Sequence, residues 1–180
     1  MTMNLRTVRP AAAEYAPFYA GYVARVRDGD IVATLRAQIE DTARLLDRAG
    51  EAGAGYAYAP GKWTVREVTG HLCDGERIFS ARALRFARGD PAPLPGFDEK
   101  AYVPAGAFEE RTLASLVTEL RAIRAATVAL FDGLPASAWA RTGTANETHV
   151  SVRALAWITA GHELHHRLLL EERYLPGLAR

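Results

Sequence analysis

Helical periodicity runs through four segments of this 180-residue chain and constrains its fold more than any other feature. In the first segment, which begins at Asp30, apolar residues recur at helical spacing with charges between them until Gly50 interrupts the pattern. The other three segments cover about 65–87, 112–131 and 151–174. We find no strand-like alternation of useful length between them. The sequence therefore predicts an all-α fold, a four-helix bundle around one core.

Capping signals mark the ends of these helices. Thr64 and Glu67 form the two ends of a capping box, in which both side chains satisfy free amides at a helix start. Ser151 is suited to cap the fourth helix. The Gly-Leu-Pro run that begins at Gly133 is expected to end the third helix, and Pro176 the fourth.

Two segments outside the helices stand out. Residues 1–28 combine two prolines with several aromatic residues, so we expect an arm that packs on the bundle rather than a tail. The connection 88–108 is rich in Gly and Pro and much longer than the usual link between bundle helices, which is typical of a loop with a function. The whole chain, 1–180, is expected to form one domain.

Composition excludes several classes of protein. A hydrophobic content of 49% with 24% charged residues is typical of one globular domain. The net charge of +1 provides no field for holding a nucleic acid, although Arg dominates the cations. No run approaches the roughly 18 apolar residues needed to span a bilayer, and the first residues lack a secretory signal, so we expect a cytoplasmic protein without a membrane partner.

Histidine placement is the most informative feature for function. His162 and His166 are four residues apart, so on a helix they project from the same face. That face also carries Leu155 and Ile158, which makes it the buried one. Both nitrogens of a buried neutral imidazole need partners, and a metal ion shared by two imidazoles supplies them.

His71, midway along the second predicted helix and near its apolar line, is the candidate for a third imidazole. Three neutral imidazoles leave at least one coordination position open, which is typical of reactive rather than structural sites. The alternative is that each histidine is a core or surface residue bonded to a backbone carbonyl. The spacing of the set favours His71, His162 and His166 as metal ligands.

For other polar residues near these histidines, the sequence gives weaker evidence of a functional role. Asp74, one turn after His71, is a candidate catalytic residue that could accept a proton from a ligand imidazole or from metal-bound water; a surface charge is the alternative. Glu76 and Arg82 are readily explained as a solvated or intrahelical charge pair. Cys73 lies about 200° around the helix from His71 and is expected to be an inert thiol.

The run from His162 to His166 also satisfies the H-E-x-x-H pattern of zinc peptidases, with Glu163 as the candidate general base. This interpretation is disfavoured because only fourteen residues follow, too few for the downstream helix that usually brings a third ligand. For His149 and His165, an ordinary structural role is expected.

Three motifs together resemble the DinB-like superfamily of bacterial metalloenzymes. They are Gly-His-Leu at 70–72 followed by Glu-Arg, Leu-Pro-Gly-Phe-Asp at 94–98, and Gly-His-Glu-Leu-His-His at 161–166. The resemblance implies a four-helix bundle with two crossover connections, frequently a homodimer. It also implies a three-histidine metal site that matches His71, His162 and His166. Characterised relatives include transferases and isomerases that use low-molecular-weight thiols, and others are presumed hydrolases.

We therefore expect a metal-dependent enzyme that acts on a small molecule, first of all a thiol-dependent S-transferase. A metal-dependent hydrolase is the alternative, and a non-catalytic metal-binding or dimerisation module is a third hypothesis. Zinc or nickel is expected, and iron or manganese stays open because imidazole suits most of these metals. A low-molecular-weight thiol would be the second cofactor.

Overall fold

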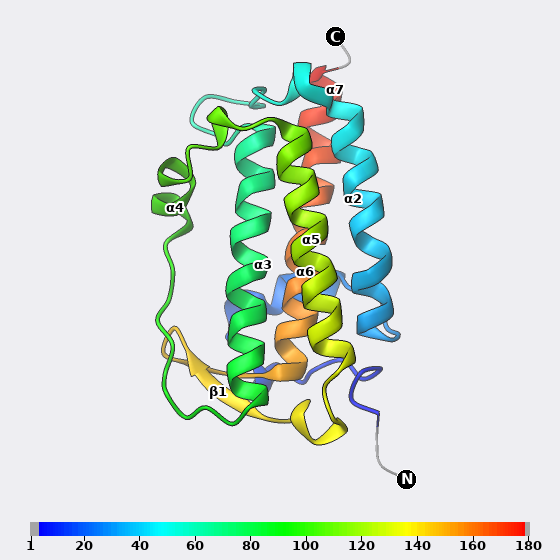
Figure 1. Cartoon of the computed structure of the whole chain (residues 1–180), viewed down its shortest axis with the longest axis vertical. Coiled ribbons are helices and arrows are strands. Elements are labelled where there is room, and N and C mark those ends of the chain that lie inside the picture. The colour runs from blue at the N-terminus through cyan, green and yellow to red at the C-terminus, as the bar shows by residue number, and fades with distance from the viewer. Residues whose placement is uncertain (1–3, 179–180) are drawn as a thin grey trace.

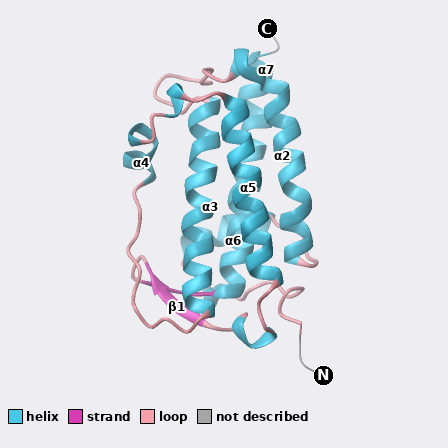
Figure 2. Cartoon of the chain, viewed as in Figure 1, coloured by secondary structure: helices cyan, strands magenta, loops and turns pink. Residues whose placement is uncertain are grey.

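Four long helices run side by side along the long axis of the computed structural model, which describes residues 4–178 (Figures 1 and 2). They are α2 (Ile31–Gly53), α3 (Val65–Ala87), α5 (Leu113–Asp132) and α6 (Val152–Leu169). Their apolar faces meet in two large buried clusters, one around Phe86 and Trp157 and the other around Leu46 and Tyr174. The prediction of an all-α four-helix bundle is confirmed.

Two of the connections cross the bundle. Helices α2 and α6 run in one direction, and α3 and α5 run in the other (Figure 1). Both α2 and α3 pack extensively on α5 and α6, whereas α2 and α3 make few contacts with each other. The links from α2 to α3 and from α5 to α6 therefore join diagonally opposite helices, which is the crossover topology expected from the resemblance.

The predicted caps are present. Asp30 accepts hydrogen bonds from two amides at the start of α2, and Ser151 accepts one from an amide of α6. Thr64 and Glu67 form the expected capping box of α3. Gly50 interrupts α2 with a φ of 60°, a left-handed conformation that favours glycine. These helix boundaries follow from local side-chain chemistry.

The expectation that Pro176 ends the last helix is wrong. A π-helical turn, Leu170–Tyr174, follows α6 directly and leads into α7 (Leu175–Leu178). Pro176 lies in the first turn of α7, where a missing N–H is tolerated. The helical path therefore passes through the proline.

The expectation of no strands is also wrong. Strands β1 (Thr142–Ala145) and β2 (Thr148–Ser151) pair antiparallel around a two-residue turn. Both turn residues, Asn146 and Glu147, have positive φ, 51° and 61°, as a type I′ hairpin requires. Four-residue strands are too short to give a readable alternation, so this segment looked like a polar loop.

The long connection 88–108 is partly ordered by the hairpin. The Leu94 amide donates to the Thr144 carbonyl at 2.9 Å, and the Asn146 amide donates to the Leu94 carbonyl at 3.0 Å. Beyond this point the chain forms the short helix α4 (Glu99–Ala105) and a 3-10 turn, Phe108–Glu110, beside α3 (Figure 1). The connection thus runs along the outside of α3.

The N-terminal arm packs on α6. It contains the 3-10 turns Ala12–Glu14 and Pro17–Tyr19, followed by the short helix α1 (Ala20–Arg25). A Cβ atom at Gly161 would lie 2.2 Å from the carbonyl oxygen of Tyr22. The absence of a side chain at Gly161 therefore allows the α1 backbone to lie directly against α6.

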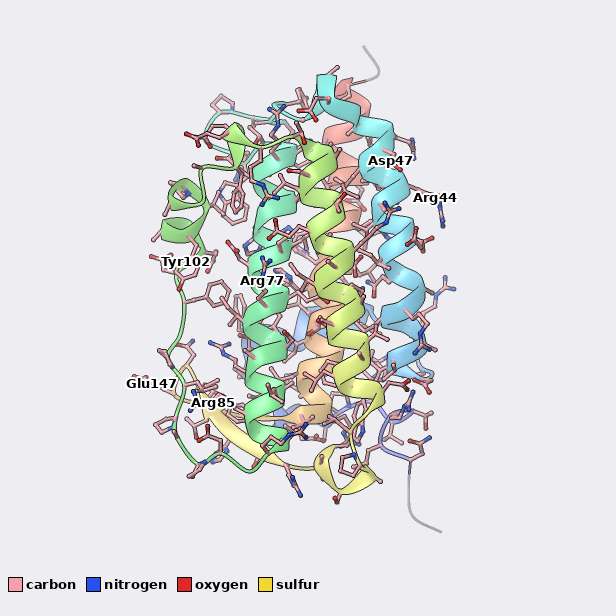
Figure 3. The ribbon with its side chains drawn as sticks, viewed as in Figure 1. Arg44, Asp47, Arg77, Arg85, Tyr102 and Glu147 are labelled. Atoms are coloured by element: carbon pink, nitrogen blue, oxygen red, sulfur yellow. The ribbon has the colours of Figure 1, made fainter. Side chains whose placement is uncertain are left out.

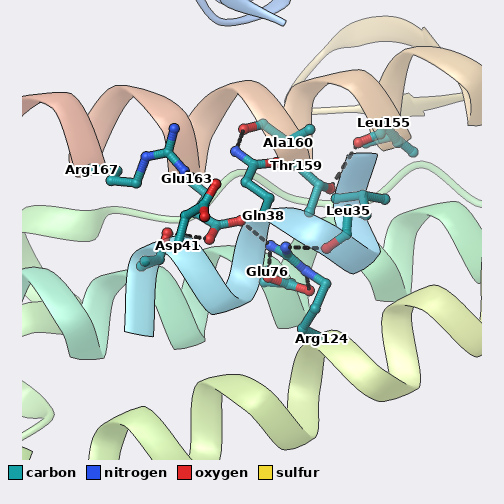
Figure 4. Close-up of polar contacts among 11 residues, drawn as sticks. Leu35, Gln38, Asp41, Glu76, Arg124, Leu155, Thr159, Ala160, Glu163 and Arg167 are labelled. Carbon is teal, nitrogen blue, oxygen red and sulfur yellow. Dashed lines mark hydrogen bonds and ion pairs between the residues drawn. The ribbon is translucent and has the colours of Figure 1, made fainter. Parts of the chain in front are cut away.

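A buried ion cluster ties the four long helices together (Figure 4). The Arg124 guanidinium of α5 donates to both carboxylate oxygens of Glu76 on α3, each at 2.7 Å, and pairs with Glu163 of α6 at 2.6 Å. It also donates to the Leu35 carbonyl of α2 at 2.9 Å, while the Thr42 hydroxyl donates to Glu163. Glu76 is therefore a core residue, and the expectation of a solvated or intrahelical pair for it is wrong.

In residues 4–178, no helix is both long and apolar enough to cross a membrane.

Candidate metal centre

The three predicted ligands meet where α3 packs against α6. His71 lies on α3, and His162 and His166 project from one face of α6, as their four-residue spacing requires. The Nε2 atoms of His71 and His162 are 2.9 Å apart, and one nitrogen from each of the three rings lies within 4.8 Å of the other two. The structure thus brings the whole set together.

All three imidazoles are buried and neutral. Burial lowers the pKa of His71 to about 4 and that of His166 to about 3, and it lowers the pKa of His162 well below its usual value. Neighbouring histidines lower the pKa of His162 and His166 further. Neutral rings offer the lone pairs that a metal needs.

The rings are held by close packing. Trp63 contacts His71 with 4.9 Å between ring centroids. Tyr22 of the arm and Phe79 of α3 each lie 5.5 Å from the His162 ring, edge to face. These contacts leave the imidazoles little freedom to rotate.

The ring nitrogens of these three histidines have few polar partners within the protein itself. Among residues 4–178, the only hydrogen bond to these rings is the one between the Nε2 atoms of His71 and His162. His166 Nδ1 is buried and has no hydrogen-bond partner in the same part of the chain. In a tetrahedral zinc site, ligand nitrogens lie about 3.3 Å apart, given Zn–N bonds of roughly 2.0–2.1 Å. The three rings therefore fit a divalent transition metal after small adjustments.

The histidines form one wall of a cavity of about 430 Å³. The other walls come from the arm, the 88–108 connection, α3 and the hairpin turn. Six of the fourteen lining residues are Phe, Tyr or Trp, and a large aromatic share is usual for small-molecule sites. The aromatic residues are Phe18, Tyr19, Tyr22, Trp63, Phe79 and Phe97, and the polar ones besides histidine are Arg82, Glu99 and Asn146.

Glu99 is the only carboxylate among the described residues that line this cavity. Burial lowers the pKa of His71, and the negative charge of Glu99 acts against that shift. Burial raises the pKa of Tyr22, and Glu99 raises it further. Glu99 therefore lies close enough to His71 and to Tyr22 of the arm to influence their pKa values.

Asp74 lies outside this cavity lining. Burial raises its pKa, Arg77 lowers it, and Glu119 of α5 raises it again. Arg77 is an exposed residue of α3 (Figure 3) that pairs with Glu119. Asp74 thus belongs to a charged group between α3 and α5, and the catalytic role predicted for it gains no support from its position.

The remaining candidates lie away from the ligand atoms or are otherwise engaged. Glu163 is held in the Arg124 cluster, which leaves the peptidase interpretation without a general base. Cys73 is buried, which raises the pKa of its thiol to about 12, so it is inert as expected. His149 is exposed, and His165 lies half-buried beside Tyr22 of the arm.

Sequence reasoning missed Tyr22, Trp63, Glu99 and Asn146. It explained Arg82 as part of a solvated or intrahelical charge pair, which is wrong because Arg82 is buried beside the cavity. Four of these five residues lie outside the four long helices, where helical periodicity carries no information. The Leu-Pro-Gly-Phe-Asp motif next to Glu99 was the available signal.

The model of the DinB superfamily matches residues 34–170. No curated protein matches the chain. Among solved structures, YfiT from Bacillus subtilis, described as a probable metal-dependent hydrolase with an unusual four-helix bundle topology, is similar over 99% of this chain and 97% of its own. Its TM-score is 0.66 and its sequence identity 16%.

Two further structures are similar. A mycothiol-dependent maleylpyruvate isomerase has a TM-score of 0.64 at 14% identity, covering 77% of this chain and 58% of its own. A DinB-like protein from Bacillus subtilis has a TM-score of 0.62 at 18% identity, covering 84% of this chain and 93% of its own. At these identities the likeness shows the fold.

Proposed function

Because the chain belongs to the DinB superfamily, we propose that its three-histidine centre holds a catalytic divalent metal ion and that the protein is a thiol-dependent S-transferase acting on a small molecule. One observation carries the proposal: His71, His162 and His166, all neutral, converge on the wall of a cavity of about 430 Å³. A purely structural metal would have no need of such a cavity.

A metal ion held by His71, His162 and His166 would supply the chemistry of a Lewis acid, which lowers the pKa of a thiol. Glu99 would accept the proton that the thiol loses, because it is the carboxylate among the described residues of the cavity lining. The sulfur would then form a bond to an electrophilic carbon of the second substrate. The leaving group departs with the electron pair of the bond that breaks.

The aromatic walls exclude water and orient the second substrate. Trp63 and Phe79 flank the histidines, while Tyr22 covers His162 from the arm. Exclusion of water favours a thiolate over hydroxide as the nucleophile. The mycothiol-dependent isomerase among the similar structures shows that a protein of this fold uses a thiol.

A metal-dependent hydrolase is the second candidate. YfiT, described as a probable enzyme of that kind, is similar over almost the whole of this chain. Water would take the position of the thiol, and Glu99 would accept its proton. A reaction that proceeds without any added thiol would favour this candidate.

Elemental analysis of untagged protein tests the metal centre. We expect about one equivalent of a transition metal in the wild type and its loss in His71→Ala and His162→Ala. His149→Ala is the matched control because His149 is exposed in the hairpin, and it should retain the metal. Unchanged metal in His71→Ala would show that the triad is not the site.

The reaction is tested by incubating the metal-loaded protein with an electrophile panel and mycothiol, bacillithiol or glutathione. We expect loss of free thiol that depends on both the metal and Glu99. Turnover of ester or amide substrates without thiol would favour the hydrolase. Full metal occupancy with neither reaction would leave a non-catalytic metal-binding module.

A further inference from the structure

Arg82 is a buried cation that faces the cavity. It lies on α3 with only 5% of its surface exposed. Its Nη2 atom donates to the Pro95 carbonyl at 2.8 Å, and its guanidinium lies 6.0 Å from the centre of the Phe97 ring. Within residues 4–178, no carboxylate oxygen lies within 4.0 Å of the Arg82 guanidinium nitrogens.

A buried charge without a counter-ion is costly, and folded proteins normally pair it. The other deeply buried arginine, Arg124, follows the rule because it contacts Glu76 and Glu163. A guanidinium has five N–H donors, and Arg82 uses one of them on Pro95. The counter-ion of Arg82 is therefore expected to come from a molecule in the cavity.

The position of Arg82 links it to the metal centre. Eleven residues separate it from His71 on α3, which corresponds to a rotation of about 20° and a rise of about 16 Å. The two residues therefore lie on the same face of one helix, and both line the same cavity. A ligand bound at the guanidinium would therefore share the cavity with the histidines.

The part of the 88–108 connection that lies beside Arg82 is held in place by backbone contacts. The Pro95 carbonyl that accepts from Arg82 follows Leu94, which is tied to the hairpin through Thr144 and Asn146. The Asn146 side chain also lines the cavity and lies so close to Gly96 that a Cβ atom there would be 2.4 Å from its Oδ1. Arg82 is thus fixed in a rigid setting, as a specificity residue should be.

We propose that Arg82 is the anion-binding residue of this cavity and that a small molecule bound there carries a carboxylate that pairs with it. The planar guanidinium matches a carboxylate with two parallel hydrogen bonds, which makes Arg the usual partner for this group. The inference rests on the proposed function only in taking the cavity for the active site.

Calorimetric titration of metal-free protein with phenylacetate tests this proposal, and the neutral phenylacetamide serves as the matched ligand. We expect phenylacetate to bind more tightly than the amide. Arg82→Gln should weaken phenylacetate at least tenfold without affecting the amide, and Arg82→Lys should restore part of the affinity. Arg85→Gln, on the same helix but outside the lining (Figure 3), should bind like the wild type.

Glutathione, a thiol that carries carboxylates, is titrated in parallel. A tenfold loss of phenylacetate affinity in Arg82→Gln assigns the carboxylate to the second substrate, and a loss confined to glutathione assigns it to the thiol. Equal binding of phenylacetate and phenylacetamide, together with glutathione binding unchanged in Arg82→Gln, would overturn the proposal.

Thermal denaturation separates a binding role from a structural one. We expect Arg82→Gln to melt at or above the temperature of the wild type, because a buried charge without a counter-ion has been removed. A marked loss of stability would assign Arg82 to the scaffold. The titrations use metal-free protein. If the histidines bound no metal, the proposed function would therefore be wrong, but the inference about Arg82 would not be affected.

Discussion

Gly75 of α3 faces the ring of His162 on α6 so closely that a Cβ atom at Gly75 would lie 2.9 Å from His162 Cε1. Tyr22 and Phe79 already contact this ring, so it cannot move aside freely. Gly75→Ala should therefore displace His162 and weaken metal binding at least tenfold, measured by competition with a chromophoric chelator.

The control for this prediction is Gly55→Ala. A Cβ atom at Gly55 would meet only the end of the Arg66 side chain, at 3.8 Å. Metal affinity should not change in that variant. Equal affinity in Gly75→Ala and the wild type would mean that the His162 ring is not fixed by α3.

The arm is predicted to detach in Gly161→Ala. A Cβ atom there would lie 2.2 Å from the Tyr22 carbonyl oxygen, and backbone atoms cannot yield as a flexible side chain does. We expect a loss of about 3 kcal/mol in the free energy of unfolding, with faster proteolysis within residues 4–28. Denaturant unfolding and limited proteolysis measure the two effects.

Gly21→Ala on α1 is the matched control for the arm. Its Cβ atom would meet only the end of the Arg25 side chain, at 3.2 Å. Because alanine favours helix over glycine, this variant should gain up to about 1 kcal/mol or stay neutral. If both variants behaved alike, the packing of α1 on α6 would not depend on Gly161.

Arg124→Met should be severely destabilising. It leaves Glu76 and Glu163 buried without their cation, at a cost of about 3–5 kcal/mol. Arg121→Met on the same helix removes only an exposed pair with Glu40, worth less than about 1 kcal/mol. Chemical denaturation of the two variants measures the difference, and similar losses would contradict the importance of the buried cluster.

Acid should destabilise the metal-free protein through the histidines. The unfolded chain protonates them near pH 6.5, whereas the folded chain takes up these protons only at about pH 4 for His71 and about pH 3 for His166. Between these values the unfolded state binds more protons, so stability is full above pH 6.5 and falls as the pH drops towards 3. The free energy of unfolding of His71→Ala should therefore fall less over this pH range, by about 3 kcal/mol in total.

Unfolding free energies measured in chelator at several pH values between 7 and 3 test this slope. The same series on His149→Ala is the control, because His149 is exposed. A slope that is unchanged in His71→Ala would show that protonation of other groups dominates.

The helices and the histidine set could be predicted because both depend on local spacing. His162 and His166 share a helix face whatever the rest of the chain does, and Thr64 with Glu67 defines a helix start on its own. The apolar stripe around His71 indicated that its side chain points into the core. These predictions needed no knowledge of which helices are neighbours.

The cavity and the ion cluster depend on tertiary contacts, which the pattern of one segment does not contain. Arg124 meets Glu76 across 48 residues and Glu163 across 39, so charges that look solvated on each helix are paired in the core. Arg82 differs from Arg124, because it is buried beside a loop in which its hydrogen-bond partner is the Pro95 carbonyl and not a carboxylate.

The attachment of Leu94 to the hairpin bears on how this protein can diversify. The hydrogen bonds to Thr144 and Asn146 use main-chain atoms, so they persist whatever side chains the neighbouring positions carry. Residues such as Phe97 can therefore change without loosening the wall, while α3 and α6 keep the histidines in place. Evolution, or a protein engineer, can therefore change the side chains on one side of the cavity and leave the three histidines as they are.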